Sequence, residues 1–339
     1  SLLDQRDEAL KKLSELVSVT AFPGSQEGQL NVFIGNGQPL VTGSFAATIK
    51  TVDSPVDSSY KEVALEINGI TNIISNELSG GKVGGLLSFR DNDLNTAINS
   101  LGRIALVLAD SVNKQHSLGM DLESKLGGTF FQDVNDTTVA KNRVVGNSLN
   151  AMPHDQDIQV NIIDSSKLTT SDYEMRFEGP GNNDFVVIRE SDDKMVLKSS
   201  LHGVYPANFE IDGFQIQFDA GTFNVGDRFS IQPTKSGASD INLDIDRDES
   251  IALAAPVLSS AHAGNTGTGT VSLGKMLDVT NPKTNQALPN FSVPGQLSPP
   301  LEVEFVTDTL YHVLDVSDPA NPVPLKPPIN NQTYRPGVT

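Results

Sequence analysis

The side chains with the best spacing for metal chemistry are aspartates in the segment LDIDRDES, residues 243–250. They occupy alternate positions, as the first three ligands of an EF-hand calcium loop do, and are Asp244, Asp246 and Asp248. Such a loop also needs glycine at its sixth position and glutamate at its twelfth, where this chain has Glu249 and Ala255. We therefore expect a solvated acidic turn and no metal site.

Other motifs that could carry chemistry are incomplete. HDQD, residues 154–157, could offer a histidine and two aspartates to a metal, but no second cluster has matching spacing. The five histidines are scattered singly, which favours surface or hydrogen-bonded structural roles. SGGKVGG, residues 79–85, lacks the spacing of a phosphate-binding loop. A Ser-His-Asp triad forms only in space and stays open, although no G-x-S-x-G elbow is present. We assign no catalytic, metal-binding or cofactor-binding residue.

Composition argues against several other classes of protein. The 339 residues carry a formal charge of −18, whereas nucleic acids and anionic membranes attract positive surfaces, so we expect neither partner. The absence of cysteine excludes disulfides and cysteine-ligated metals. The longest apolar runs, 104–109 and 251–258, are too short to span a bilayer. No signal peptide opens the chain, which begins at Ser1, and we expect it to be a fragment.

The first element that could position side chains is an amphipathic helix over residues 2–17. Charged residues alternate on one face, and the other face carries an apolar stripe of Leu3, Leu10, Leu13 and Val17. Arg6 falls on this stripe, where it could interrupt the apolar contact or pair with an acid on a partner helix.

The most informative element is a second helix, predicted from about Asn92 to Leu118. Its apolar residues are four and three positions apart in turn, which is the a/d repeat of a helix packed along another helix. These predicted assembly-interface residues, which we call the seam, are Leu94, Ile98, Leu101, Ala105, Leu108 and Val112. A glycine-rich turn should precede the helix, and Gly119 should cap its end. Many such stripes pack only within their own domain, so the pattern alone leaves the partner open.

Turn signals between alternating apolar residues predict β-hairpins. Asn36-Gly37 and Asn68-Gly69 each indicate a hairpin with a type I′ turn. Asp212-Gly213 lies at the centre of the clearest hairpin, and residues 226–233 should continue its sheet. We expect modest, β-rich cores, because hydrophobic residues make up only 37% of the chain and tryptophan is absent.

An internal repeat links two of the β regions. In the first copy, residues 173–177 alternate apolar and charged side chains and are followed by a strand at 184–187. Residues 301–305 and 310–313 repeat this arrangement. The second copy lacks the strands that follow the first, so the last domain is either incomplete or a degenerate half.

These patterns predict a multidomain α+β protein. Residues 1–131 would form a helical domain with β-hairpins, incomplete in this chain. Residues 132–262 would form a β-rich domain, in which 248–262 could be a short helix interrupted by its proline. Residues 263–339 would form a second, truncated β-rich domain after a linker-like segment at 264–270.

The amino-acid sequence of the first 131 residues resembles that of one protein family. LLDQRDEALKKLSELV, NVFIGNGQPLV, GGLLSFRD, LGRIALVLADSVNKQHSLGMDL and GGTFF occur here in the order found in the first hook-associated protein of bacterial flagella, also called the hook–filament junction protein. The resemblance is strong over residues 2–50 and 80–131. It is weaker over residues 173–235 and very weak beyond residue 263.

The resemblance implies a structural subunit, outside the cell, at the junction between hook and filament. It also implies that residues 1–131 are a helical stem domain and that 132–262 and 263–339 are β-rich outer domains. Its partners would be other copies of itself, the hook protein and a neighbouring hook-associated protein, after type III export. An export chaperone would bind terminal helices that have no counterpart in this chain. Two alternatives remain from other classes: a secreted β-rich glycan-active enzyme with a helical stalk, and an adhesin on an axial scaffold. The absence of tryptophan disfavours a carbohydrate platform.

Overall fold

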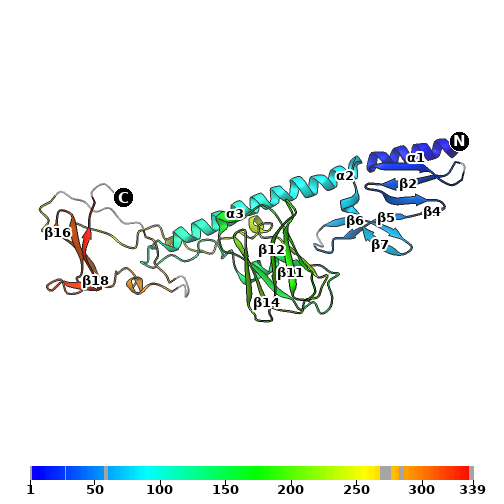
Figure 1. Ribbon diagram of the computed structural model, residues 1–339. Coiled ribbons are helices and arrows are strands. Elements are labelled where there is room, and N and C mark those ends of the chain that lie inside the picture. The colour runs from blue at the N-terminus through cyan, green and yellow to red at the C-terminus, as the bar shows by residue number, and fades with distance from the viewer. Residues whose placement is uncertain (1, 27, 57–59, 268–275, 282–285, 336–339) are drawn as a thin grey trace. The chain divides into compact units, whose positions relative to one another are not determined.

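The computed structural model describes residues 2–26, 28–56, 60–267, 276–281 and 286–335. It combines helices with five antiparallel sheets in the described residues, which confirms the mixed α and β class (Figure 1). The chain divides into two compact units. The first comprises Ser1–Val107 and Val134–Ile241, and the second comprises Leu108–Asp133 and Asn242–Thr339. The predicted domain boundaries after residues 131 and 262 stay a prediction.

The secondary structure is dominated by short strands. The helices are α1 (Leu2–Leu16), α2 (Gly81–Ser88), α3 (Asn95–Ser117), α4 (Thr137–Asn142) and α5 (Gly237–Asp240). The strands are β1 (Val19–Pro23), β2 (Leu30–Ile34), β3 (Gln38–Thr42), β4 (Phe45–Ala46), β5 (Thr48–Asp53), β6 (Lys61–Ile67), β7 (Ile70–Ile73), β8 (Val144–Gly146), β9 (Asp157–Ile162), β10 (Tyr173–Phe177), β11 (Asp184–Arg189), β12 (Lys194–Ser200), β13 (Ala207–Ile211), β14 (Phe214–Ala220), β15 (Arg228–Ile231), β16 (Leu301–Thr307), β17 (Leu310–Asp315) and β18 (Val323–Thr333).

The N-terminal helix and two small sheets share one core. The sheets have the strand orders β1-β2-β3-β4 and β5-β6-β7. Val17, Ile34, Leu65 and Ile74 are buried together, and Leu13 of α1 packs against them. Helix α1 is thus confirmed over the predicted residues. Arg6 donates to the carbonyl of Gly28, 3.0 Å away, and pairs with Asp7 of its own helix rather than with an acid elsewhere.

Two of the three predicted hairpin turns have two residues. Ile67 pairs with Ile70, and both Asn68 and Gly69 have positive φ, so a type I′ turn is confirmed there. The Asp212-Gly213 turn between β13 and β14 has the same geometry.

The turn at Asn36 differs from the prediction. Ile34 pairs with Gln38, so the loop has three residues, and Asn36 is not among those with positive φ. Its N–H donates to the carbonyl of Glu77, 2.7 Å away. The hairpin between β2 and β3 is therefore confirmed, but its type I′ turn was wrong because a tertiary contact fixes the loop.

The long helical segment begins earlier than predicted. Residues from Gly81 onward are helical, and a π-helical turn at Phe89–Leu94 joins α2 to α3. Gly81 has φ +58°, and a Cβ there would lie 2.4 Å from the carbonyl carbon of Leu16. The predicted start at Asn92 was wrong, because the glycines after residue 80 lie inside the first turns of the helix rather than in a preceding loop.

The predicted glycine cap at the other end of this segment was also wrong. Helix α3 ends at Ser117, and Gly119 is not among the glycines with positive φ. A Cβ at residue 119 would lie 2.1 Å from the carbonyl oxygen of Ala252. Glycine is therefore needed here for close backbone approach and not for a left-handed conformation.

Two sheets packed face to face share the larger of two clusters of buried apolar residues (Figure 1). Their strand orders are β12-β11-β10-β15-β8 and β13-β14-β9, and we call this part the β8–β15 domain. Its core is rich in phenylalanine, and the rings of Phe177 and Phe223 stack at 4.6 Å between centroids. Strand β15 pairs with β10 and β8, so the prediction that residues 226–233 continue the sheet of the Asp212-Gly213 hairpin was wrong.

Apart from the end of α3 and one sheet, the described residues of the second unit have little regular structure. The predicted helix at 248–262 was wrong: only Asp248–Ser250 form a 3-10 turn, and Ala254 bridges to Met120. The predicted linker at 264–270 lies partly outside the described residues, and its described part is irregular. Strands β16, β17 and β18 form an antiparallel sheet, in which Phe305 pairs with Tyr311. The first copy pairs Phe177 with Phe185 in the same way, so both predicted hairpins of the repeat are present.

Candidate assembly interface

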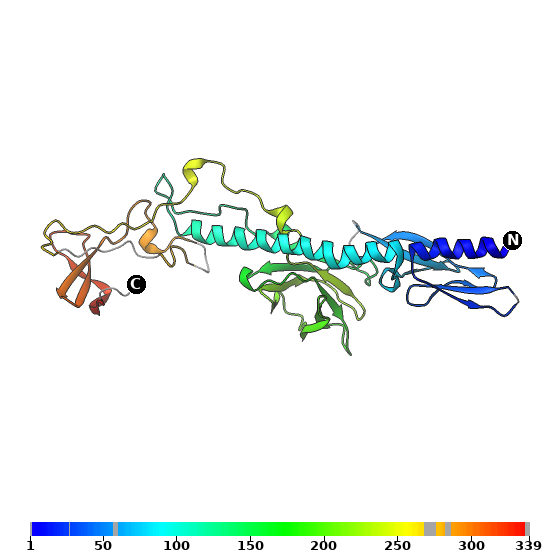
Figure 2. The ribbon, with the colours of Figure 1, turned by 90° about the horizontal axis from the view of Figure 1, so that it is seen from above.

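One face of α3 is buried against the β8–β15 domain. Asn99 is 3% exposed, and its Nδ2 donates to the carbonyl of Thr170 and to the carboxylate of Asp172. Leu106 belongs to the phenylalanine-rich core. At Gly102 a Cβ would lie 1.7 Å from the carbonyl oxygen of Thr234, so only glycine lets the two backbones meet. Figure 2 shows this domain along one side of the helix.

The same face continues to the end of α3 within the second unit, where two polar side chains hold returning chain segments. Asn113 Nδ2 donates to the carbonyl of Phe131, and its Oδ1 accepts from the N–H groups of Phe130 and Phe131, all at 2.9 Å. His116 is buried, with Nδ1 2.8 Å from the carbonyl of Gly128 and Nε2 accepting the N–H of Ala252. A carbonyl on one side and a donor on the other fix the neutral tautomer protonated at Nδ1. The expected hydrogen-bonded structural role is confirmed for this histidine.

The predicted seam runs along the side of α3 that the chain leaves open. Leu94, Leu101 and Leu108 are 40%, 61% and 49% exposed, respectively. The other three seam residues are half-buried and lie closer to the covered face, and these are Ile98, Ala105 and Val112. The structure places no partner helix on this seam within the described residues. Its role in assembly stays a prediction.

The exposed apolar surface is wider than the predicted seam. Ile104 is 64% exposed and lies next to Leu101 and Leu108 on the helix. Leu86 of α2 and Phe89 of the π-helical turn are 69% and 54% exposed. Sequence reasoning missed them because Ile104 breaks the strict a/d spacing and the others precede the predicted start of the helix. Exposed apolar side chains that are neighbours on a helix make this side of α3 a candidate contact surface.

Sequence reasoning also missed the covered face of α3. It includes Asn99, Gly102, Leu106, Ala109, Asn113 and His116. These residues are three or four positions apart, as on any helix face. Because only Leu106 is a large apolar residue, a search for hydrophobic periodicity cannot find this face. The signal in the sequence is the alternating three- and four-residue spacing of Asn99, Gly102, Asn113 and His116 around Leu106 and Ala109.

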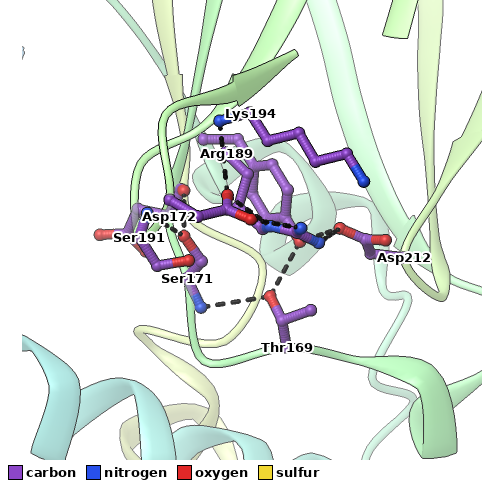
Figure 3. Close-up of polar contacts among 9 residues, drawn as sticks. Thr169, Ser171, Asp172, Arg189, Ser191, Lys194 and Asp212 are labelled. Atoms are coloured by element: carbon purple, nitrogen blue, oxygen red, sulfur yellow. Dashed lines mark hydrogen bonds and ion pairs between the residues drawn. The ribbon is translucent and has the colours of Figure 1, made fainter. Parts of the chain in front are cut away.

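Polar contacts at one end of the β8–β15 domain are structural (Figure 3). The hydroxyl of Tyr173 lies 2.8 Å from both Thr169 and Asp212, and Arg189 pairs with Asp212 at 3.0 Å. Burial, together with the hydrogen bond to Asp212, raises the pKa of the Tyr173 hydroxyl well above its usual range. Arg189 also pairs with Asp192 and thereby lowers the pKa of that carboxyl. Each group has a partner, as expected of a network that fixes strand ends.

The residues that might have carried chemistry do not converge. Asp244 accepts a hydrogen bond from Thr129, and Asp157 pairs with Lys141. His154 Nε2 lies 3.0 Å from the carbonyl of Asn150. In the described part of the chain, no three histidine or carboxylate side chains gather where they could hold a metal ion. Among the same residues, no helix combines the length and apolar content needed to cross a membrane.

Comparison with known proteins gives two domain matches to one family. Residues 1–131 match the model of the flagellar hook-associated protein FlgK helical domain. Residues 145–233 match that of the flagellar hook-associated protein 1 D2-like domain.

Individual relatives carry the same name. Flagellar hook-associated protein 1 of Salmonella typhimurium is 31% identical over 255 residues, which are 75% of this chain and 43% of the relative. The Escherichia coli protein of that name is 31% identical over 257 residues, covering 75% of this chain and 44% of its own length. The chain therefore spans less than half the length of these curated relatives.

A solved structure agrees with these matches. The flagellar hook junction protein FlgK from Burkholderia pseudomallei is similar with a TM-score of 0.69 at 31% identity, over 80% of this chain and 48% of that one. Two domain models, the curated relatives and a solved structure thus give the same assignment. The chain belongs to the family of flagellar hook-associated protein 1.

Proposed function

We propose that this chain is part of a structural subunit of the bacterial flagellum, at the junction between hook and filament. The observation that carries the proposal is the open apolar side of α3 and of the π-helical turn before it. Leu94, Leu101 and Leu108 are 40% to 61% exposed there, in a chain that matches the hook-associated family. Apolar area that a single chain leaves in water is stabilised when another helix covers it, by about 25 cal/mol per Å². Subunit packing in coiled-coil fashion is therefore the function that we propose for the seam.

The domain arrangement belongs to the same proposal. Residues 1–131 would form the helical stem domain, with 132–262 and 263–339 as β-rich outer domains. Support comes from α1, α2 and α3, which all lie in the first range, and from the β8–β15 domain, which lies in the second. The covered face of α3 fixes the helix to that domain, so the opposite side is free for assembly.

The partners that we propose are other copies of this chain, the hook protein and a neighbouring hook-associated protein. An export chaperone would bind the terminal helices of the whole subunit, and the site of action would be outside the cell. The names of the relatives support a flagellar location, and the net charge of −18 disfavours nucleic acid as a partner.

The enzyme and adhesin alternatives have less support. A cavity of about 230 Å³ in the β8–β15 domain is lined by Asn147, Asn150, His154 and neighbouring residues, with no carboxylate among them. Glycoside hydrolysis needs two carboxylates on either side of the bond that breaks. The matched relatives are named as flagellar hook-associated proteins, and we propose no enzymatic activity.

The test is a charge on the seam. We expect Leu101→Glu and Leu108→Glu to leave the helical content of the chain unchanged, because both side chains already contact water. Cells whose only copy carries either substitution should shed their filaments and lose motility. Thr96→Glu is the matched control, since Thr96 is exposed on the same helix but lies off the seam. Normal filaments in both leucine variants would contradict the proposal.

A further inference from the structure

The contact between Asn99 of α3 and Asp172 beside β10 has an unmet hydrogen-bonding requirement. Asn99 Nδ2 donates to the carbonyl of Thr170 at 3.2 Å and to Asp172 Oδ1 at 3.0 Å. Its Oδ1 is buried and has no hydrogen-bond partner. A buried amide oxygen left without a donor is unfavourable. The junction between the helix and the β8–β15 domain therefore lacks one donor.

Protonation of Asp172 can supply that donor. An ionised carboxylate only accepts hydrogen bonds, whereas a carboxylic acid also donates one. With Asp172 protonated, its O–H can donate to Asn99 Oδ1 while Asn99 Nδ2 continues to donate to the carbonyl of Thr170. Both polar atoms of the buried amide are then satisfied.

The charged groups around Asp172 come from three parts of the first unit. Lys235, which precedes α5, favours the ionised carboxylate, as does the hydrogen bond from Asn99. Burial acts in the opposite direction and is stronger, and it raises the pKa of Asp172 to about 6. Glu190, just after β11, faces Asp172 and Glu174, and burial together with these carboxylates raises its pKa as well. On α3, the charged residue nearest to Asn99 in the sequence is Arg103, whose Nε is buried without a hydrogen-bond partner.

We propose that Asn99 and Asp172 form a proton-linked latch, in which uptake of one proton by Asp172 completes the hydrogen bonds of Asn99 and tightens the attachment of α3 to the β8–β15 domain. The direction of the pH effect follows from the pKa. The unfolded chain binds this proton only near pH 4, whereas the folded chain binds it below about 6. The stabilisation is present in acid and is lost as the pH rises through about 6.

Hydrogen exchange of the α3 amides over residues 96–106 tests the latch in the whole chain. After correction for the intrinsic rates, we expect exchange at pH 5 to be slower than at pH 7.5, by on the order of tenfold. Asp172→Asn supplies a permanent donor and removes the titrating carboxyl, so its exchange should depend on pH less than in the parent chain, with Glu190 responsible for the remainder. Glu178→Gln is the control, because it removes an exposed carboxylate just after the same strand. It should retain the pH dependence of the parent chain.

A second variant covers the case in which Asp172→Asn does not fold. Asn99→Ala removes the amide, and the pH dependence of exchange should shrink to the part that burial of Asp172 alone produces. The same pH dependence in Asn99→Ala as in the parent chain would overturn the latch, as would equal pH dependence in Asp172→Asn. The measurement needs no flagellar partner, so its outcome is independent of the assembly proposal.

Discussion

The two copies of the internal repeat have the same local structure and opposite burial. Tyr173, Met175 and Phe177 in β10 are at most 1% exposed, whereas in β16 Leu301, Val303 and Phe305 are 40%, 50% and 47% exposed. Both strands alternate apolar and charged residues, and both pair with the next strand in antiparallel register. The difference between them lies in what covers the apolar face.

A second sheet accounts for the difference. In the β8–β15 domain, the β13-β14-β9 sheet packs on β10 and β11, and Phe218 lies 5.4 Å from Phe185 between ring centroids. The β16-β17-β18 sheet has no buried residue in any of its strands. Alternation thus determines which side chains share a face of a strand, but burial requires a partner layer.

The largest expected effect is a difference between matched phenylalanine truncations. Phe177→Ala should lower the free energy of unfolding of the β8–β15 domain by about 3–5 kcal/mol, because the ring packs against Phe185, Phe223 and Phe229. Phe305→Ala should cost about 1 kcal/mol or less, since half of that side chain already contacts water. Hydrogen exchange resolved by peptide measures the two regions separately in one denaturant series.

This pair of variants can contradict the conclusion that the two copies differ in the burial of their apolar faces. Equal losses would mean that the Phe305 face is covered in solution and that the second copy folds against another layer. A small loss for Phe177→Ala would mean that the core can close around the cavity. Phe45→Ala, at a 37% exposed ring outside both copies, controls for the general effect of removing an aromatic side chain.

Much of the fold could be predicted from local patterns. The Asn68-Gly69 and Asp212-Gly213 turns were correct because both residues must adopt positive φ, a local preference of these residue types. The turn at Asn36 was wrong because the carbonyl of Glu77, distant in the sequence, fixes it. The same limit applies to Gly119, whose need for glycine comes from Ala252. Local signals fail where a distant backbone group decides the conformation.

A smaller effect is expected from the tyrosines of the two copies. Tyr173→Phe removes hydroxyl contacts to Thr169 and Asp212 and leaves the buried network in Figure 3 incomplete. We expect a loss of about 1–2 kcal/mol in the free energy of unfolding of the β8–β15 domain. Tyr311→Phe in β17 should change stability by less than about 0.5 kcal/mol, because this half-buried side chain contributes a ring contact to Phe305. Urea unfolding followed by circular dichroism gives both values, and a larger loss for Tyr311→Phe would reverse the comparison.

The candidate interface could be predicted only in part. The seam was recognised because Leu94, Leu101 and Leu108 are apolar, and hydrophobic periodicity detects such residues directly. The covered face of α3 could not be recognised in this way, because Asn99 is held by hydrogen bonds and Gly102 by close backbone approach rather than by apolar contacts. The periodic apolar residues therefore mark the open side of this helix, which is the reverse of the usual expectation for a single domain.

The smallest energetic effect, but a direct one, comes from changing the polarity of the open sheet. Val303→Thr keeps the β-branched shape of a side chain that is 50% exposed, so the stability of the sheet should change by only a few tenths of a kcal/mol. Binding of a fluorescent dye that recognises exposed apolar surface should fall, because Val303 lies in the middle of the apolar row of β16. Val187→Thr makes the same change in the first copy, opposite Met175, which is the residue that corresponds to Val303. There it should destabilise the domain and leave dye binding to the folded chain unchanged, since Val187 is 0% exposed. Unchanged dye binding in Val303→Thr would mean that this face is covered in solution, and the contrast between the two copies would then be one of partner rather than of burial.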